Sequence, residues 1–507
     1  MQVLKTDVVI IGAGAAGIRA ALAASAKGAD VVVISKAPVG MGGSTFSGIT
    51  RGWGIQGLVG NERTDKNLKR FYDEIMQTGL GRCDPELVRI LVEESGPRIE
   101  DLISFGLRFQ KEDCGSYRRV RGCFSECRRA FMTEDFKNVK KTFRSMLNAS
   151  SAKFIHGTVL ELMVSDNQCL GAFVFRAPET LILVKAKATV LATGGAAAIF
   201  GDHLVEEGHI GEGYRLAHKA GARLENLEFI QFMLGVKSRG TPRMLPLGEL
   251  RNGGVFLDNR GGDVLKRHIP DSELRMRSID ARLKHFPFSS RDVSGLIDIA
   301  IATERAQGGR VYWHSRKSNQ PGEVFHFAHA QNGGVKIDDK AESTVSGLFA
   351  AGEVAAGPHG ADRLGGCMMT ATQVFGARAG HAAACHARRK TRNIEIQKIP
   401  ESIRMAERFN KQREKTEPID ELIGDIRKTA SAKLMILRKE RGIKSCLNEI
   451  QSAEAQLEKM ADQAPLSALK AKTVLAVMTM IATAALNRKQ SLGSHYRCDG
   501  PHPTAAV

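Results

Sequence analysis

Two short apolar segments near the start of the chain have the pattern of buried β-strands. Asp7–Ile11 and Asp30–Ile34 each consist of one aspartate followed only by valines and isoleucines. Uninterrupted apolar runs of this length are typical of parallel strands that are covered on both faces. Ile18–Lys27, between them, is rich in alanine and favours a helix. The chain therefore begins with a strand–helix–strand unit of an α/β fold.

The same apolar pattern returns further along the chain. Residues 59–150 have largely helical, amphipathic patterns, for example over Leu87–Leu102. Later apolar runs predict further strands: Phe154–Val164, Gly171–Phe175, Leu181–Lys187, Ala188–Ala192 and Gly347–Ala351. We expect these strands to extend the first sheet.

Two regions do not show this alternation of predicted strands and helices. Between about residues 235 and 330 the α/β pattern is interrupted, with a hairpin element predicted over Leu250–Asn259 and a helix from Ser290 to Ala302. Beyond about residue 396 the sequence is charged, helical and nearly free of glycine, which predicts a small helical bundle. The pattern thus predicts an inserted domain and a helical C-terminal domain.

A glycine-rich turn joins the first strand to the first helix. Gly12-Ala13-Gly14-Ala15-Ala16-Gly17 has the spacing G-x-G-x-x-G. In this context the glycines permit a tight turn and close approach of a pyrophosphate, whose negative charge faces the helix N-terminus. The second strand ends in Ser35-Lys36, where a chain that binds NAD usually has an acidic residue. The motif predicts a dinucleotide site that departs from the NAD pattern.

A second glycine-rich segment, Gly352–Gly366, follows the strand Gly347–Ala351. It reads G-E-V-A-A-G-P-H-G-A-D-R-L-G-G. Glycines let the backbone approach a ligand closely, Glu353 is placed to bond sugar hydroxyls, and the planar fork of Arg363 suits a carboxylate. This segment resembles the succinate dehydrogenase/fumarate reductase flavoprotein family, which carries G-E…H-G-A-N-R-L-G at this point.

Four other segments resemble motifs of that family in the same order. They are Ile210–Tyr214 (family T-G-D-G-Y), Ser290–Ser294 (P-R-D-V-V-S), Phe327–Val335 (H-Y-T-M-G-G-I) and Gly493–Asp499 (R-G-S-H-Y-R-x-D). The resemblance covers nearly the whole chain. It implies a split Rossmann-like FAD-binding domain, an inserted α+β capping domain and a C-terminal helical bundle. We expect the FAD-binding domain at 1–234 and 331–395, the capping domain at 235–330 and the helical domain at 396–507.

The resemblance also implies how FAD is held. Membrane-bound members of the family attach the flavin covalently to a histidine, and Ser44 occupies that position here, so we expect FAD to be bound non-covalently. The residues expected to contact it lie in the glycine-rich turns and at strand ends: Gly12, Gly14, Ala15, Ala16, Gly17, Ser35, Lys36, Gly42, Gly43, Ser44, Thr45, Val159, Ala192, Thr193, Gly194, Glu212, Glu353, Met368 and Met369.

The implied reaction transfers a hydride between flavin N5 and the carbon–carbon double bond of an unsaturated carboxylic acid. Arg363 and His329 would bind a carboxylate, and Arg291 matches the arginine that the family uses as proton donor. Because free arginine is a poor acid, this role requires a relay. The family relay has the pattern E-x-x-R-G-E-G-G, which Glu249–Gly254 does not match.

The distal part of the substrate pocket departs further from the family. Met233 stands where the family motif F-V-Q-Y-H-P-T has a histidine that binds a second carboxylate. Because a thioether has no hydrogen to donate, we expect a substrate with one carboxylate and an apolar group near Met233. Arg239 or Arg243 could supply a second cation.

Other functions stay open at this stage. An L-aspartate oxidase-like oxidation is the main alternative, since those members also lack covalent flavin, and adenylylsulfate reductase is a more distant relative. The formal charge of +18 raises a third class, a flavin-bearing nucleic-acid-binding protein. No basic–aromatic interleaving or nucleic-acid motif supports it, so nucleic acid is not expected.

The cysteines and apolar segments bear on partners and location. Nine cysteines at irregular spacing include no C-x-x-C pair, so no metal site is predicted and electrons would come from an iron–sulfur or other electron-transfer partner. Reduced thiols and a strand close to the N-terminus predict a cytoplasmic protein without a signal peptide. The apolar run Thr473–Leu486 is shorter than a membrane span and predicts a buried helix instead of a transmembrane segment.

Overall fold

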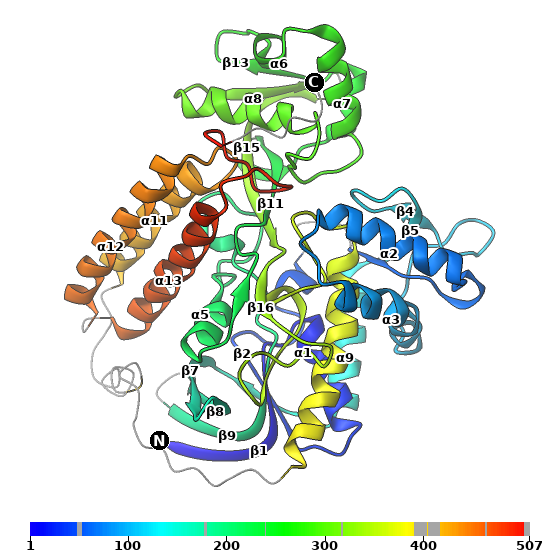
Figure 1. Cartoon of the computed structure of the whole chain (residues 1–507), viewed down its shortest axis with the longest axis vertical. Helices are drawn as coiled ribbons and strands as arrows, with labels where there is room; N and C mark the ends of the chain where they lie inside the picture. Colours follow the sequence, from blue (N-terminus) through cyan, green and yellow to red (C-terminus); the bar gives the residue numbers. More distant parts are fainter. Residues whose placement is uncertain are drawn as a thin grey trace.

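The computed structural model describes most of the chain and is shown in Figure 1. The described residues are 1–47, 53–176, 180–238, 240–315, 318–389, 403, 416–461 and 464–500. They form an α/β body, a capping region at one end of it and a bundle of long helices along one side (Figure 1). The predicted α/β fold, with an inserted α+β capping region and a helical C-terminal region, is confirmed.

A seven-stranded sheet forms the centre of the body. Its main order is β6-β2-β1-β9-β8-β7, and β17 pairs with the last part of β9. The strands β6, β2, β1, β9 and β17 are parallel, whereas β7 and β8 are antiparallel. Their bounds are Gln2–Ile11 (β1), Val31–Ser35 (β2), Lys153–His156 (β6), Thr158–Ser165 (β7), Gln168–Arg176 (β8), Thr180–Leu191 (β9) and Leu348–Ala350 (β17).

The predicted strands are present, with two differences in their bounds. The segment predicted as one strand over Phe154–Val164 is two strands, β6 and β7, which are separated at Gly157. A Cβ at Gly157 would lie 2.9 Å from the carbonyl oxygen of Phe175, so this close contact needs a glycine. Conversely, the two runs predicted between Leu181 and Ala192 form the single strand β9.

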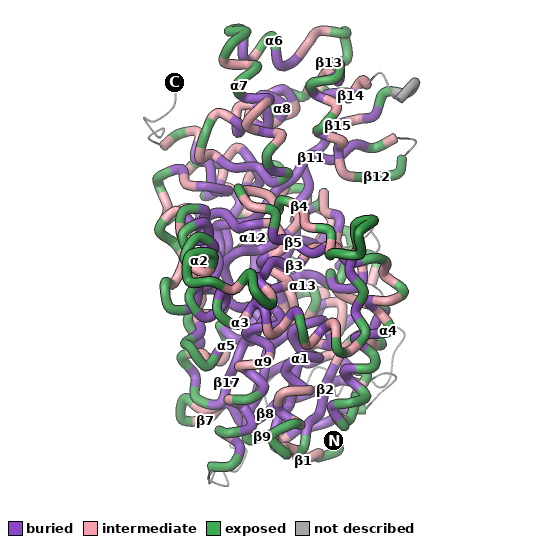
Figure 2. Tube along the Cα trace, turned by 90° about the vertical axis from the view of Figure 1, so that its right-hand side faces the viewer, coloured by how far each residue is buried: buried purple, intermediate pink, exposed green. Residues whose placement is uncertain are grey.

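Helices α1 (Ala15–Ser25) and α9 (Cys367–Ala387) pack closely on the sheet. A Cβ at Gly380 would lie only 2.1 Å from the carbonyl oxygen of Ala20, and one at Gly376 would lie 2.8 Å from that of Ala16. The two glycines therefore allow the backbones of the helices to touch. Figure 2 shows this region as part of the buried interior.

Four further helices and two small sheets complete the described part of the body. The helices are α2 (Asp65–Gly79), α3 (Pro85–Ser104) and α4 (Phe136–Ala149), and a shorter one is α5 (Glu212–Lys219). One small sheet has the order β3-β5-β4 (Gly54–Gln56, Arg128–Met132, Arg119–Arg121) and the other β10-β16-β18 (Leu224–Glu225, Gly334–Lys336, Ala355–Ala356). Residues 59–150 are therefore largely helical, as predicted.

The capping region is a five-stranded sheet covered by three helices. Its order is β12-β11-β15-β14-β13, with bounds Thr241–Met244 (β12), Ile230–Ser238 (β11), Ser318–Gln331 (β15), Val311–Ser315 (β14) and Val255–Asp258 (β13). The helices are α6 (Val264–His268), α7 (Ser272–Arg282) and α8 (Gly295–Ala306). Since β11 and β15 run across the predicted boundaries at 234 and 330, these two strands connect the capping region to the body.

Two predicted elements of the capping region were wrong in detail. Instead of a hairpin over Leu250–Asn259, the chain forms a 3₁₀ segment, Leu247–Asn252, followed by β13, which pairs with β14. The helix expected from Ser290 begins at Gly295, because residues 289–291 bond to other segments of the chain.

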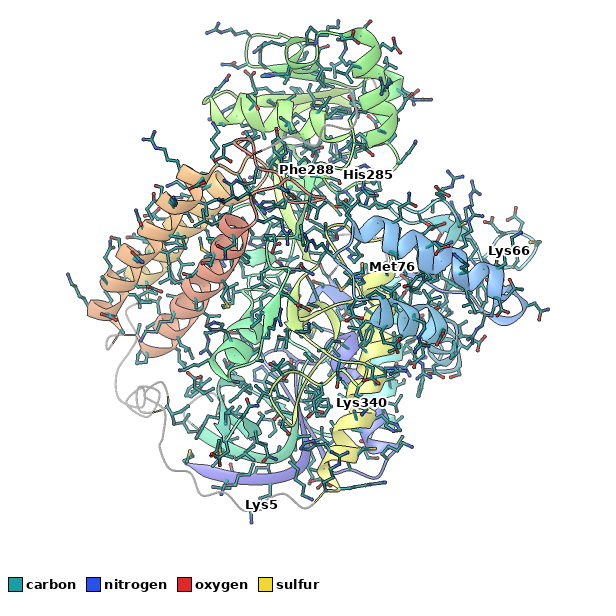
Figure 3. The ribbon with its side chains drawn as sticks, in the orientation of Figure 1. Lys5, Lys66, Met76, His285, Phe288 and Lys340 are labelled. Atoms are coloured by element: carbon teal, nitrogen blue, oxygen red, sulfur yellow. The ribbon has the colours of Figure 1, made fainter. Side chains whose placement is uncertain are left out.

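A buried ion pair holds the lower edge of the capping region together. Arg282 and Asp298 are both fully buried, and Arg282 Nε donates to Asp298 Oδ2 at 2.7 Å. His326 Nε2 lies 3.3 Å from the other carboxylate oxygen. Next to this pair, His285 and Phe288 lie where the capping region meets the body (Figure 3). His285 stacks on Phe124 of the body with ring centroids 4.2 Å apart.

The C-terminal region is a bundle of α11 (Glu417–Leu434), α12 (Glu440–Met460) and α13 (Pro465–Asn487). The expectation that the last apolar segment is too short to span a membrane was wrong in length, because α13 has 23 residues. Among the described residues it is the one helix long and apolar enough to cross a membrane. Half of its most apolar window is buried inside the structure, as in the core helix of a bundle.

The segment after α13 returns to the body. Ser494 Oγ donates to the carbonyl oxygen of Ala361 at 3.0 Å, and Ser290 N donates to the carbonyl oxygen of Gly493 at 2.7 Å. Arg438, which is fully buried, donates to the carbonyl oxygen of Glu228 and contacts His495 Nδ1 at 2.6 Å. This segment therefore joins the bundle to two loops of the body.

The contact between α1 and α9 can be tested by adding one methyl group. Gly380→Ala should lower the free energy of unfolding by about 1–3 kcal/mol, because the new Cβ overlaps a backbone oxygen that cannot move away alone. Gly424→Ala in α11 is the matched control. A Cβ there meets nothing within 4 Å, so it should be neutral or raise stability by about 0.5–1 kcal/mol. Urea unfolding midpoints measure both, and equal midpoints for the two variants would contradict the contact.

Candidate active site

A cavity of about 460 Å³ lies between the sheet of the body and the capping region. It is lined by the turn before α1, the ends of β2 and β9, the Gly42–Thr45 loop, β11, β15 and the loop before α9. Of the site residues predicted from the sequence, Gly17 and Arg291 alone do not line it. Segments that are far apart in the sequence thus meet around one elongated space.

The N-terminus of α1 opens into one end of this cavity. Its N-cap residue, Gly14, supplies no side-chain bond, and the first turn carries no acidic residue. A Cβ at Gly17 would lie 1.9 Å from the Gly12 carbonyl oxygen, and Gly12 has a φ of 109°. Both positions therefore require glycine, and the helix end they hold attracts negative charge.

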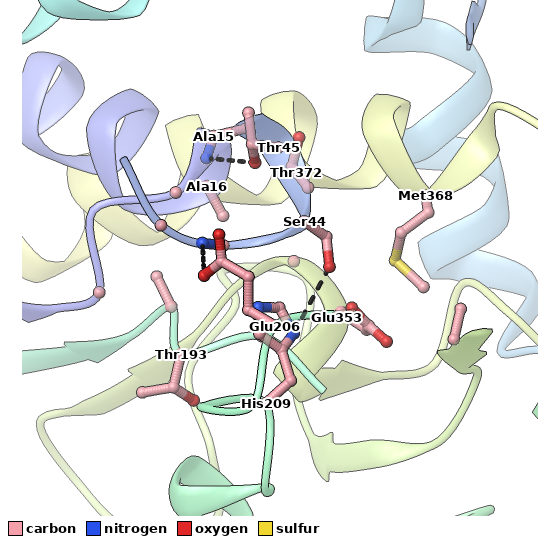
Figure 4. A pocket seen from close by; sticks show the side chains of 18 of the residues that line it. Ala15, Ala16, Ser44, Thr45, Thr193, Glu206, His209, Glu353, Met368 and Thr372 are labelled. Carbon is pink, nitrogen blue, oxygen red and sulfur yellow. Dashed lines mark hydrogen bonds between the residues drawn. The ribbon is translucent and has the colours of Figure 1, made fainter. Parts of the chain in front are cut away.

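The Gly42–Thr45 loop covers the middle of the cavity (Figure 4). Thr45 Oγ1 accepts from Ala15 N at 3.1 Å, which fixes this loop to the start of α1. Gly43 N donates to Glu206 Oε2 at 2.7 Å, and His209 Nδ1 lies 3.4 Å from Ser44 Oγ. Burial lowers the pKa of His209, so its imidazole is neutral at neutral pH.

Sequence reasoning missed Glu206 and His209, although both line the cavity. They belong to a loop without a recognisable motif and contact residues more than 160 positions earlier in the chain. The sequence signal for these two residues is weak: a carboxylate and an imidazole in the loop that precedes the Ile210–Tyr214 motif. Two other predicted residues, Lys36 and Glu212, pair with each other across the cavity wall.

Glu353 is partly buried and lines the cavity. Its Oε1 accepts from Gln331 N at 2.9 Å, and burial raises the pKa of the carboxyl. A Cβ at Gly195 would lie 2.2 Å from the same oxygen, so the turn after β9 packs directly on this carboxylate. Glu353 thus connects the turn after β9, β15 and the loop before α9.

The opposite end of the cavity holds a buried cation. Arg363 is 8% exposed, and its guanidinium donates to the side-chain oxygen of Gln231 and to the carbonyl oxygen of Leu364. Within the described part of the chain no carboxylate pairs with it, and both Arg363 Nε and Gln231 Nε2 lack a hydrogen-bond partner. A buried charge without a counter-ion is costly, so this end of the cavity is suited to an anion.

His329 lies beside Arg363 on the cavity wall. Burial and the positive charge of Arg363 lower the pKa of His329 to about 4. At neutral pH its imidazole is therefore uncharged and has one N–H to donate. An uncharged donor next to a fixed cation suits a carboxylate oxygen.

Arg291 lies next to the cavity instead of in its wall. Its Nε donates to Asp362 Oδ2 at 3.0 Å and its second nitrogen donates to the carbonyl oxygen of Thr78 at 2.7 Å. The guanidinium packs 4.8 Å from the centre of the Phe124 ring, and the residue that precedes this phenylalanine, Cys123, lines the cavity. Arg291 thus contacts the residue that follows Cys123 of the wall, while its own side chain does not line the cavity.

Met233 adds an apolar thioether to the cavity wall. It is 7% exposed and packs with Leu204, Phe325 and Phe327, which do not line the cavity. Arg243, one of two candidates for a second cation, is exposed on β12. The other candidate, Arg239, lies outside the described residues.

The donor set fits a dinucleotide at one end and an anion at the other. An uncapped helix N-terminus faces the first end, and a glycine loop held by Thr45 and Glu206 covers the middle. At the far end are two donors that have no partner among the described residues. Lys36, after the carboxyl end of β2, and Glu212, at the start of α5, complete the wall. These residues would hold FAD in the cavity.

Family models agree with this assignment. Residues 7–369 match a model described as FAD binding domain, and residues 424–505 match one described as fumarate reductase flavoprotein C-terminal domain. Together they cover the body, the capping region and most of the helical bundle.

Individual proteins are similar over most or all of the chain. The chain is 30% identical to a subunit of the CoM/CoB fumarate reductase of Methanothermobacter marburgensis, over 99% of this chain and 95% of that protein. It is 31% identical to L-aspartate oxidase of Mycobacterium leprae, over 75% of this chain and 74% of that protein.

Two solved structures share the fold. "Mycobacterium smegmatis Sdh1 in complex with UQ1" has a TM-score of 0.80 at 23% identity, covering 100% of this chain and 90% of that one. A mutant FrdA chain of Escherichia coli quinol fumarate reductase has a TM-score of 0.79 at 21% identity, covering 98% of this chain and 92% of that one. With the family models, these similarities show that the chain belongs to the fumarate reductase/succinate dehydrogenase flavoprotein family of FAD-dependent oxidoreductases.

Proposed function

We propose that this enzyme holds FAD non-covalently and reduces a carbon–carbon double bond next to a single carboxylate. The observation that carries the proposal is the buried guanidinium of Arg363, which has no counter-ion among the described residues and one unpartnered N–H. A substrate carboxylate would supply the missing negative charge. Bound FAD would supply the hydride.

Arg363, Gln231 and His329 would act together on the carboxylate. Arg363 offers a planar pair of donors, Gln231 an unpartnered N–H and His329 a neutral imidazole N–H. As a hydride adds to the distal carbon, negative charge builds up on the carboxylate oxygens. Donors that are already in place stabilise that charge without reorganising.

Met233 supports a substrate with an apolar group. The thioether of Met233 in the cavity wall has no hydrogen to donate to a second carboxylate beside it. An apolar or aromatic group there would instead gain from burial, by about 25 cal/mol per Å². We therefore assign aryl or alkyl acrylate-like mono-acids as the substrate class.

L-Aspartate oxidation is the second candidate, and the similarity to L-aspartate oxidases favours it. L-Aspartate carries two carboxylates and an ammonium group. The three carboxylates on the cavity wall, those of Glu206, Glu212 and Glu353, already bond to backbone N–H groups or to Lys36. The cavity therefore fits an unsaturated mono-acid better than it fits aspartate.

We also propose a separate electron donor. Among the described residues, no group of three or more His, Cys, Asp or Glu side chains could hold a metal ion. The similar fumarate reductase protein of Methanothermobacter marburgensis is named as one subunit of its enzyme. An iron–sulfur protein or another electron-transfer partner would reduce the flavin.

Non-covalent attachment can be tested by acid precipitation of the yellow enzyme. Ser44 is a weak nucleophile at the position where membrane-bound members of the family have the histidine that attaches the flavin, and the neutral imidazole of His209 contacts its hydroxyl. All flavin absorbance should therefore appear in the supernatant. Colour that stays with the precipitated chain after washing would contradict non-covalent binding.

Replacing the fork of Arg363 should stop turnover without releasing FAD. Arg363→Lys keeps the charge but loses the bidentate geometry, and turnover should fall by about 10²-fold or more. Arg243→Lys, at an exposed position of the same capping sheet, is the control and should have no effect. Turnover is measured as reoxidation of the reduced flavin by the acid, and near-normal rates for Arg363→Lys would remove this residue from the site.

The apolar wall predicts the order of substrate preference. An aryl acrylate should have a higher kcat/KM than fumarate, and Met233→Gln should lower that kcat/KM on the order of tenfold. Met233→Leu, which conserves volume and polarity, should change it little. Steady-state assays with both acids measure this. Efficient turnover of fumarate, with none of any mono-acid, would show that another donor binds a second carboxylate.

A further inference from the structure

A buried carboxyl group lies directly behind the two arginines of the proposed site. Asp362 precedes Arg363 in the chain, is 1% exposed, and binds Arg291 through its Oδ2 at 3.0 Å. Ser289 Oγ donates to the same oxygen at 2.6 Å. The other oxygen, Oδ1, is buried and has no hydrogen-bond partner in the described structure.

This arrangement suits a group that gains and loses a proton. An unpartnered oxygen on a buried carboxylate costs free energy. Protonation of Oδ1 removes the charge and leaves both bonds to Oδ2 in place. Burial raises the pKa of Asp362 to about 6, even though Arg291 and Ser289 lower it, and Asp292 raises it further.

The residue that the sequence offers for a relay is elsewhere. Glu249, in the segment whose spacing does not match the family relay, accepts from Ser315 Oγ in the capping region. The structure instead connects Arg291 to Asp362, from a loop 71 residues away. The neighbours that face Asp362 are Arg291, Asp292 and Ser289 from the loop before α8, and Arg363 follows it in its own loop.

We propose that Asp362 stores the proton that Arg291 delivers to the substrate. In this step the guanidinium of Arg291, which lies next to the cavity wall and must turn inward to reach the substrate, gives a proton to the carbon that becomes a carbanion as the hydride adds to its neighbour. The protonated carboxyl of Asp362 then returns a proton to the neutral guanidine, leaving a carboxylate. Between turnovers Asp362 regains a proton from water by way of Arg291, whose side chain is 18% exposed.

The inference rests on the proposed reduction of a double bond and goes beyond it by naming the proton source. A purely structural ion pair between Asp362 and Arg291 would hold the loop in place at every pH. A proton store works only while the carboxyl is protonated. The raised pKa therefore predicts a rate that is high below pH 6 and falls as the pH rises through that value.

The test uses the FAD-loaded enzyme, reduced without oxygen and mixed with a saturating aryl acrylate at pH values on both sides of 6. Reoxidation by the wild-type enzyme should slow as the pH rises. Asp362→Asn should be about 10²-fold slower at the acidic end of this range and independent of pH, and Asp362→Glu should restore a pH-dependent rate. Glu249→Gln is the matched control and should behave as wild type.

Two outcomes would overturn the proposal. One is an Asp362→Asn variant with the wild-type rate and pH profile. The other is a variant that loses rate equally at every pH and binds a saturated analogue, followed by the flavin spectrum, more weakly in parallel, because that pattern belongs to a structural pair.

An infrared titration distinguishes failure of the proton-store proposal from failure of the proposed function. If no unsaturated acid reoxidises the wild-type enzyme, the proposed reaction is wrong. The proposal that Asp362 stores a proton is then tested by the infrared carboxyl stretch alone. A buried protonated carboxyl that titrates near pH 6 in wild type and Glu249→Gln, and is absent from Asp362→Asn, supports a proton store. Its absence from the wild-type enzyme overturns it.

Discussion

The geometry of the whole site depends on close backbone contacts that leave no room for a side chain at the glycines involved. At the first turn, Gly12 lies against the carbonyl of Ala192 and Gly17 against that of Gly12, which aims the N-terminus of α1 into the cavity. Gly380 then lets α9 lie against α1. Because the loop before α9 carries Arg363, the position of the buried cation follows from how closely these helices pack.

The resulting cavity favours negative charge at both ends. A helix N-terminus faces one end, and the guanidinium of Arg363, which no described carboxylate neutralises, faces the other. Of the carboxylates between them, Glu212 pairs with Lys36, Glu206 accepts from Gly43 N, and burial raises the pKa of Glu353. A dinucleotide phosphate and a substrate carboxylate would therefore each meet positive charge or N–H groups in the same cavity.

Local patterns predicted much of the fold and the nucleotide end of the site. Val/Ile runs and glycine spacing are properties of a few consecutive residues, so strands such as β1 and β2 and the turn at Gly12 could be located from them. Contacts between distant segments leave no such trace. The pairing of His209 with Ser44 and of Arg291 with Asp362 depends on loop paths, and the start of α8 moved because Ser289 and Ser290 bond outside their own segment.

The segment that follows α13 has a consequence for how the protein is made. Gly493 bonds Ser290, next to Arg291, and Ser494 bonds Ala361, two residues before Arg363, across sequence separations of 203 and 133 residues. A ribosome synthesises the chain from its N-terminus, so the dinucleotide end can form while translation continues. The loops that carry Arg291 and Arg363 gain their support only after residue 494 has emerged.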